Sequence, residues 1–265
     1  MSQWPHLPNA PITEALIDIR VKLPAEVTLE TLSTFQDGIR ARYPNRRERA
    51  SWQSQFEVAP GAVPRLHEPT GGVDGYLFVS PEGNQIVQAR QDGFTFSRLK
   101  PYETWEQLKD EAAALWDQYK ALTRPVQILR TAVRYINRIE IPLPVVDLRR
   151  WFHTTPEVAR TLPQGLSEFF IRLVIPFDNP RATAIVTQTV VQSDARDVVP
   201  IILDIDAFQE ETCAPDAVDL WDRFEQLRNV KNRVFFESIT KETEDLFECP
   251  ASSQGGLGAP ATSPR

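Results

Sequence analysis

Hydrophobic and polar residues alternate with a period of two over residues 12–21, and this alternation predicts a half-buried strand. The apolar face carries Ala15, Ile17, Ile19 and Val21, and the opposite face carries Glu14, Asp18 and Arg20. Pro24 ends the strand, and Thr28 then caps a helix whose apolar residues recur at helical spacing as far as Pro44. The chain therefore opens with a strand followed by an amphipathic helix.

Further strands and a second helix complete the first half of the pattern. Strand-like runs lie at about 51–59, 75–80, 85–91 and 93–99. Asp92-Gly93, between the last two runs, is typical of a tight hairpin turn. Thr104 then caps a helix with a wide apolar stripe from Trp105 to Leu122, which ends before Pro125.

The same order of elements restarts after Pro125. The expected elements are a strand at about 128–141, a short helix from Asp147, strands at about 168–177, 182–191 and 199–206, and a long helix over about 216–247. Because the order of elements repeats while residue identity does not, the sequence predicts an internal duplication.

The predicted fold class is α+β, with two tandem β-α-β(3–4)-α units that have antiparallel sheets and long terminal helices. The expected units are residues 1–124 and 125–248, and residues 249–265 form a Ser-, Gly-, Pro- and Ala-rich tail that we expect to be disordered. This topology resembles the TATA-binding-protein and helix-grip folds, in which a curved antiparallel sheet wraps a long helix. A fold resemblance of this kind does not define a function.

Composition places the chain in the globular class, with 42% hydrophobic and 25% charged residues among 265. No stretch approaches the ~18 apolar residues of a membrane span, and the N-terminus lacks a signal-peptide pattern. We therefore expect a cytoplasmic protein. The formal net charge of −7 makes nucleic acid an unfavourable partner. A basic cluster is expected at a helix end and the loop after it, and a solvated helix terminus is favoured there over a binding patch. It comprises Arg40, Arg42, Arg46, Arg47 and Arg49.

The chemistry of known enzyme motifs is missing from the sequence, which has no phosphate-binding glycine loop, nucleophile elbow or His-Glu-x-x-His string. Cys213 and Cys249 are expected to be free thiols, and the three histidines are scattered, so we expect neither a metal nor a cofactor. Asp204 and Asp206 share one strand face and are a candidate metal pair, although a solvated strand face is favoured. These features favour a protein without enzymatic activity.

One constellation of charges stands out on the two opening strands of the predicted units. It comprises Glu14, Asp18 and Arg20 on the first strand and Arg134, Arg138 and Glu140 on its counterpart. If the two strands pair, these six side chains share one sheet face, and we expect at least one arginine-carboxylate contact across the strands. They form either a structural ion ladder or a binding site for an anionic ligand or an acidic protein surface.

Three strings of residues resemble those of a sporadically distributed bacterial family of about this length. They are Asn9-Ala10-Pro11-Ile12-Thr13-Glu14-Ala15, Val133-Arg134-Tyr135-Ile136-Asn137-Arg138-Ile139, and Asn232 with Phe235-Phe236. The resemblance implies a two-part architecture and a patchy occurrence, and it supplies no catalytic residue. We expect a binding or adaptor protein that presents its sheet to another protein, within a bacterial defence or toxin-neutralising cassette. The alternative is a helix-grip protein or enzyme with a small-molecule pocket between the sheet and the long helix.

Overall fold

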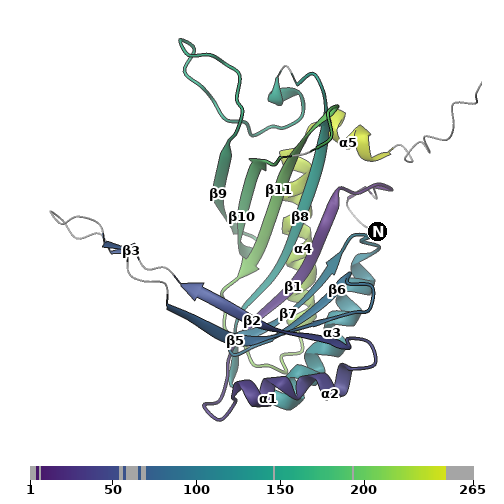
Figure 1. Cartoon of the computed structure of the whole chain (residues 1–265), viewed down its shortest axis with the longest axis vertical. Helices are drawn as coiled ribbons and strands as arrows, with labels where there is room; N and C mark the ends of the chain where they lie inside the picture. The colour runs from purple at the N-terminus through teal and green to yellow at the C-terminus, as the bar shows by residue number, and fades with distance from the viewer. Residues whose placement is uncertain are drawn as a thin grey trace, which may run out of the picture.

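The computed structural model describes residues 4–5, 7–53, 56–57, 65–66, 70–145, 147–192 and 194–248. The strands of its main sheet are β1 (Ile12–Lys22), β2 (Asn45–Gln53), β5 (Thr70–Val79), β6 (Gln85–Arg90), β7 (Gly93–Leu99), β8 (Gln127–Pro142), β9 (Phe170–Asp178), β10 (Arg181–Val190) and β11 (Val198–Gln209). These nine strands form one sheet in the order β2-β5-β6-β7-β1-β8-β11-β10-β9, and every neighbouring pair is antiparallel (Figure 1). The predicted α+β class with an antiparallel sheet is confirmed.

The helices gather on one face of this sheet. They are α1 (Leu29–Ser33), α2 (Phe35–Ile39), α3 (Trp105–Thr123), α4 (Leu220–Ser238) and α5 (Lys241–Glu248). The long helix α3 packs on β1 and β7, and α4 packs on β8, β10 and β11 (Figure 1). A further pair of short strands, β3 (Phe56–Glu57) and β4 (Arg65–Leu66), lies outside the main sheet. We call the face of the main sheet opposite α3 and α4 the open face, because no described helix covers it.

The period-two pattern decides which side chains enter the core. Ile17 of β1 and Val133 of β8 are directly opposite each other in the register, and both are fully buried beneath the helices. Trp116 of α3 and Phe224 of α4 are buried against this side of the sheet. The intervening residues of the same strands necessarily point to the open face.

The first predicted helix is two short helices, and Thr34 separates them. The hydroxyl of Ser33 donates to the backbone carbonyl of Glu30 at 2.7 Å. The hydroxyl of Thr34 donates to the backbone carbonyl of Thr31, also at 2.7 Å. These local bonds compete with a continuous helical ladder. The apolar residues at helical spacing still face inward, since Leu32 and Phe35 are buried.

Arg40 and Arg42 of the basic cluster lie at the end of α2 and in the turn after it, as predicted, whereas Arg46, Arg47 and Arg49 lie in a strand rather than in a loop, which corrects the prediction. β2 begins at Asn45, directly after Pro44, because its backbone pairs with β5, with Arg47 opposite Leu77 and Arg49 opposite Gly75. Such pairing between distant segments leaves no local signal in the sequence.

The last predicted helix is also interrupted. α4 ends at Ser238, and Ile239 adopts an extended conformation that bridges to Phe152. The N–H of Thr240 donates to the carbonyl of Trp151 at 3.0 Å, so the 3₁₀ segment η1 (Leu148–Arg150) and its neighbours replace the helical bonds. The predicted tail over 249–265 lies outside the described residues.

The strand predicted at about 51–59 starts earlier, since β2 covers Asn45–Gln53, and residues 54–55 and 58–59 of that prediction lie outside the described residues. The remaining predicted strands and the helix over Trp105–Thr123 overlap the observed elements. β6 and β7 form the hairpin expected at Asp92-Gly93, with Arg90 opposite Gly93 in the register. α3 ends at Thr123 and β8 begins at Gln127, so no helix passes through Pro125. Among the described helices, none combines the length and apolar character that spanning a membrane requires.

Candidate functional site

All six charged residues singled out in the sequence lie on the open face. In the register of β1 with β8, Asp18 is opposite Ala132 and Leu16 is opposite Arg134. Directly opposite residues of a sheet share a face, so the two charged sets are neighbours there. They are Glu14, Asp18 and Arg20 of β1 and Arg134, Arg138 and Glu140 of β8.

The expected ion pair across β1 and β8 does not form between these six described residues. Arg20 and Asp18 pair within β1, with 3.1 Å between Nε and Oδ1, and Arg138 and Glu140 pair within β8 at 3.2 Å. The register explains this outcome, because Arg20 is opposite another arginine, Arg130. The charged side chains of β1 and β8 therefore pair within their own strand or with a residue on the other side of that strand.

Arg134 pairs with a residue of β11, the strand on the side of β8 away from β1. Its Nε donates to Oδ1 of Asp204 at 2.8 Å, and its Nη2 donates to Oδ2 at 2.5 Å. This bidentate contact raises the pKa of Arg134, whereas partial burial lowers it. The candidate metal pair of the sequence is used in the same way, because Asp206 pairs with Arg130 at 2.7 Å. The described residues contain no group of three or more acidic, histidine or cysteine side chains that could hold a metal ion.

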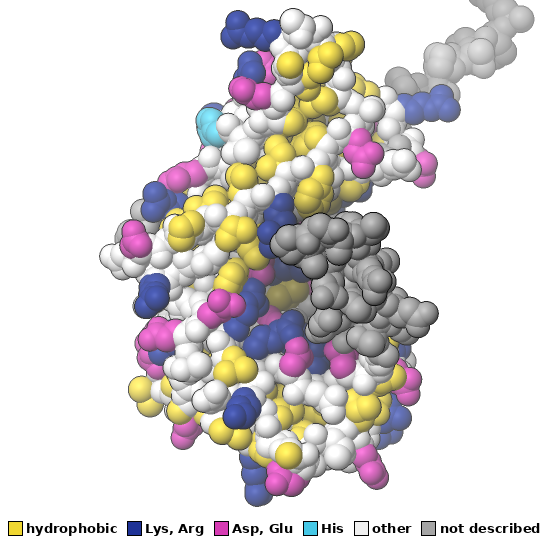
Figure 2. Space-filling model, turned by 90° about the vertical axis from the view of Figure 1, so that its left-hand side faces the viewer, with side chains coloured by type: hydrophobic (Ala, Val, Ile, Leu, Met, Phe, Trp, Pro, Cys, Tyr) yellow, Lys and Arg dark blue, Asp and Glu magenta, His cyan; other side chains and the backbone are white. Residues whose placement is uncertain are grey.

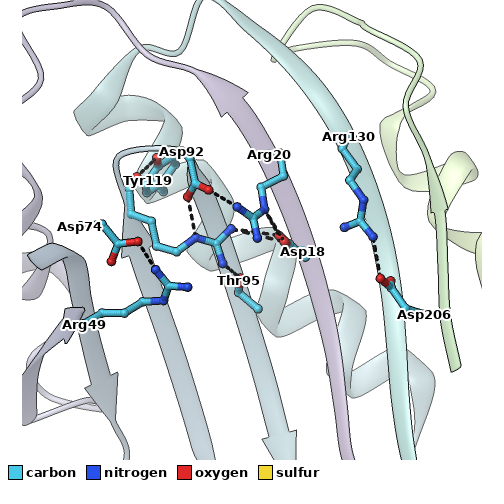
Figure 3. Close-up of polar contacts among 10 residues, drawn as sticks. Asp18, Arg20, Arg49, Asp74, Asp92, Thr95, Tyr119, Arg130 and Asp206 are labelled. Carbon is cyan, nitrogen blue, oxygen red and sulfur yellow. Dashed lines mark hydrogen bonds and ion pairs between the residues drawn. The ribbon is translucent and has the colours of Figure 1, made fainter. Parts of the chain in front are cut away.

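A hollow of about 490 Å³ opens in the middle of the open face, between β2 and β11. Its lining contains five guanidinium groups and two carboxylates, and each of the five arginines pairs with at least one described aspartate in or beside the hollow. The charged groups of the lining belong to Arg20, Arg49, Arg90, Arg130, Arg134, Asp18 and Asp206. Figure 2 shows basic and acidic side chains gathered beside this part of the sheet, and Figure 3 shows the contacts among them. We call this feature the arginine hollow.

A buried ion pair between Arg90 and Asp18 forms the floor of the arginine hollow. Nη2 of Arg90 lies 3.0 Å from Oδ2 of Asp18, and the two side chains are 4% and 8% exposed. The Arg90 guanidinium also donates to Asp92 at 2.9 Å and to the Thr95 hydroxyl at 2.6 Å. Tyr119 of α3 donates to the Arg90 carbonyl at 2.8 Å from the core side. Arg90 is therefore held from both sides of the sheet.

Glycine on both neighbouring strands makes room for this buried guanidinium. Gly75 of β5 and Gly93 of β7 are the residues directly opposite Arg90. A Cβ on Gly93 would lie 3.1 Å from Nη2 of Arg90 and 2.2 Å from the carbonyl oxygen of Ile19. The flat placement of Arg90 across the sheet therefore depends on these glycines.

The remaining arginines surround this floor and are more exposed. Arg49 pairs with Asp74, and Arg20 bridges Asp18 and Asp92 (Figure 3). Among the described residues, the side chain of Arg49 donates to Asp74 alone, through Nη1.

Arg130 is held by a carboxylate and by a ring. Its Nη2 donates to Oδ2 of Asp206 at 2.7 Å, and its guanidinium carbon lies 4.2 Å from the centre of the Phe208 ring. Burial raises the pKa of Asp206, and the charge of Arg130 opposes this rise. The pair is thus partly shielded from water at the edge of the hollow.

An apolar strip adjoins the arginine hollow on the open face. Phe170 and Val174 of β9 are 67% and 55% exposed, and the exposed Arg172 lies between them on the same face. Ile185 is opposite both Val174 and Asp206, which places the strip and the hollow on one face. Figure 2 shows hydrophobic side chains along this part of the sheet.

Sequence reasoning missed Arg90 and Arg130, and it named Arg49 only in the basic cluster, where a solvated helix terminus was favoured over a binding patch. For Arg90 the sequence did hold a signal. Arg90 is two residues before Asp92 of the predicted tight turn, so its guanidinium could be expected to lie near the Asp92 carboxylate. Comparison of the sequence with models of known protein families gives no match. No curated protein matches it either.

Proposed function

We propose that this chain is a non-enzymatic binding protein that uses the open face of its sheet to bind another protein. In this proposal the arginine hollow receives an acidic group of the partner, and the apolar strip packs against the partner's hydrophobic side chains. The observation that carries the proposal is the continuity of the two features on one face that no described helix covers.

The chemistry of the arginine hollow supports an acidic group as the feature it recognises. Guanidinium groups donate in a planar fork that matches a carboxylate, and Arg is enriched at protein interfaces for this reason. The floor pair of Arg90 and Asp18 is fixed by its own contacts, whereas Arg134 keeps a side-chain exposure of 44%. A partner therefore meets preorganised donors rather than flexible ones.

A protein fits this face better than a nucleic acid does. The net charge of the chain is −7, which disfavours binding of an extended phosphate backbone. The exposed side chains of Phe170 and Val174 offer apolar area next to the charges. Apolar patches rimmed by polar groups are typical of protein interfaces.

The proposal includes the internal duplication predicted from the sequence. Outward from the centre of the sheet, β1 is followed by β7, β6, β5 and β2, and β8 is followed by β11, β10 and β9. In each half the first strand lies at the centre beside the last strand of that half, and a long helix follows that last strand. This mirrored order supports two tandem units that resemble the TATA-binding-protein topology, with the arginine hollow near their junction.

The proposal is tested by comparing what variants of the purified chain capture from the cells that make it. Arg130→Ala, Arg134→Ala and Phe170→Asp each remove one contribution of the open face, and Arg233→Ala on α4 is the matched control on the opposite side. We expect the same partner with the unaltered chain and with Arg233→Ala, and its loss with the three open-face variants. Equal capture by all four variants would refute the proposal.

A further inference from the structure

A second pocket, of about 600 Å³, lies on the helix-covered side of the same sheet. Its described walls come from residues 4–5 and 7–12, from residues 100–106, and from β8 and α4. It lies between the sheet and a long helix, where the alternative function inferred from the sequence requires a pocket. It is separate from the arginine hollow, because Tyr135 lines this pocket and Arg134 lines the hollow on the other face of β8.

Lys231 of α4 reaches into this pocket, and it has no acidic partner among the described residues. Its Nζ lies 3.7 Å from the centre of the Tyr135 ring, and the residue is 8% exposed. No hydrogen bond or ion pair joins Lys231 to another described residue. Lys109, Lys120 and Lys241, by contrast, each pair with a carboxylate. Burial lowers the pKa of Lys231 to about 7, and the charge of Arg228 adds to the effect.

Two tyrosines supply a further donor beside this lysine. The hydroxyl groups of Tyr102 and Tyr135 lie 3.0 Å apart and share one hydrogen bond. One phenol donates to the other, so one O–H remains available to the pocket. Burial raises the pKa of Tyr102 to about 12 and raises that of Tyr135 further, so both phenols stay protonated near neutral pH.

Flat aromatic rings form another part of the wall. Trp4 and Phe236 stack with 5.3 Å between ring centres and an interplanar angle of 1°. The two acids of the lining are engaged by arginines: Glu103 lies 3.1 Å from Arg98, and Glu106 lies 3.8 Å from Arg228. The pocket therefore presents the N–H donors of Lys231 and one phenol O–H next to an apolar surface. A buried donor that has no acceptor destabilises the folded protein, so a ligand that supplies an acceptor is favoured.

We propose that this pocket binds a small organic anion with a flat apolar body. Its anionic oxygens accept hydrogen bonds from Nζ of Lys231 and from the hydroxyl pair of Tyr102 and Tyr135, and its apolar body packs against the rings of Trp4 and Phe236. The anion supplies hydrogen-bond acceptors for Nζ of Lys231 and for the remaining phenol O–H, for which the described residues supply none. This site is independent of the open face, and neither proposal needs the other.

Calorimetric titration with naphthalene-2-sulfonate tests the proposal, with the uncharged naphthalene-2-sulfonamide as the matched ligand. We expect the full chain to bind the sulfonate at least about tenfold more tightly than the sulfonamide, and Lys231→Met to abolish that difference. Lys120→Met, on the exposed side of α3, should change neither titration. Absence of saturable binding, or a sulfonate preference that survives Lys231→Met, would overturn the proposal.

The pH dependence of the titration gives a separate readout. The charged and titratable groups that line the pocket with Lys231 are Arg228 on the same helix, Lys100 and Glu103 before α3, Glu106 at the start of α3, and the phenols of Tyr102 and Tyr135. The pKa of Lys231 is about 7, so sulfonate affinity should fall about tenfold per pH unit above pH 7. A flat profile contradicts the assignment of Lys231.

Chemical labelling of the unaltered chain tests the site without any substitution. Acetic anhydride at neutral pH acylates neutral amines, so Lys231 should react early, and saturating naphthalene-2-sulfonate should slow its acetylation severalfold. Lys120 is the internal control and should be unaffected. Equal acetylation of Lys231 with and without the sulfonate, read by peptide mass spectrometry, overturns the proposal.

Discussion

Arg90 and Asp18, 72 residues apart in the sequence, form an ion pair that is almost fully buried in the open face of the sheet. Removing one charge of such a pair leaves the other desolvated without its partner. Asp18→Asn, which keeps the shape of the side chain, should therefore lower the free energy of unfolding by about 3 kcal/mol. Urea denaturation measures this loss.

Glu140→Gln is the matched control for that substitution. Its carboxylate pairs with Arg138 and is 54% exposed. Exposed pairs stabilise proteins little, so the expected change is below about 1 kcal/mol. If Asp18→Asn costs no more than Glu140→Gln, the pair is not the structural floor of the arginine hollow.

Arg134→Ala and Arg138→Ala should separate binding from folding. Their side chains are 44% and 33% exposed, so each variant should unfold within about 1 kcal/mol of the unaltered chain. Capture of the partner should nevertheless be lost with Arg134→Ala, because its guanidinium lines the hollow. Strong destabilisation, or normal stability with normal capture, would contradict a binding role for Arg134.

Gly93→Ala should be far more damaging than Gly83→Ala. Both glycines have positive φ, at 155° for Gly93 and 75° for Gly83. A Cβ at Gly93 would lie 2.2 Å from the carbonyl oxygen of Ile19, whereas a Cβ at Gly83 meets nothing within 4 Å. We expect a loss of about 1 kcal/mol at Gly83 from the backbone conformation alone, and of at least about 3 kcal/mol at Gly93. Similar thermal shifts in the two variants would be inconsistent with close approach of β7 to β1.

Lys231→Met should stabilise the protein near neutral pH. Burial lowers the pKa of Lys231 to about 7 in the folded chain from the ordinary lysine value of 10.5, so between these values the unfolded chain binds more protons. Stability attributable to this residue therefore rises with pH across that window and is lowest below it.

The methionine variant lacks this penalty, which we expect to be on the order of 3 kcal/mol at pH 7 after the favourable contact of Nζ with the Tyr135 ring is allowed for. The stability difference between the two chains should shrink toward pH 10, as measured by urea denaturation at several pH values. A difference that is independent of pH would show that Lys231 is fully charged or well solvated in the folded protein.

Period-two alternation was sufficient to predict which face each residue of β1 and β8 occupies. It could not predict which residues are opposite each other, because the register between strands more than a hundred residues apart depends on the whole sheet and includes irregularities near Ile12 and Arg20. For this reason an arginine-carboxylate contact between β1 and β8 was expected, whereas Asp18 contacts Arg90 of β6.

The pocket around Lys231 left a weak signal in the sequence. Leu227, Lys231 and Val234 occupy one apolar stripe of α4, so the lysine stands at a core position. The stripe predicts burial of Lys231, but it does not reveal that Tyr102 and Tyr135 converge on it. That convergence depends on tertiary packing of segments from both halves of the chain.

Photocrosslinking in the cells that make the protein tests the central claim most directly. A benzophenone side chain at Val174 or Ile202 probes the open face, and one at Arg233 probes the helix-covered side. The account predicts one crosslinked partner protein from Val174 and from Ile202, and none from Arg233. Crosslinks of equal strength from Arg233, crosslinks to a second copy of this chain alone, or no crosslink from the open face would contradict it.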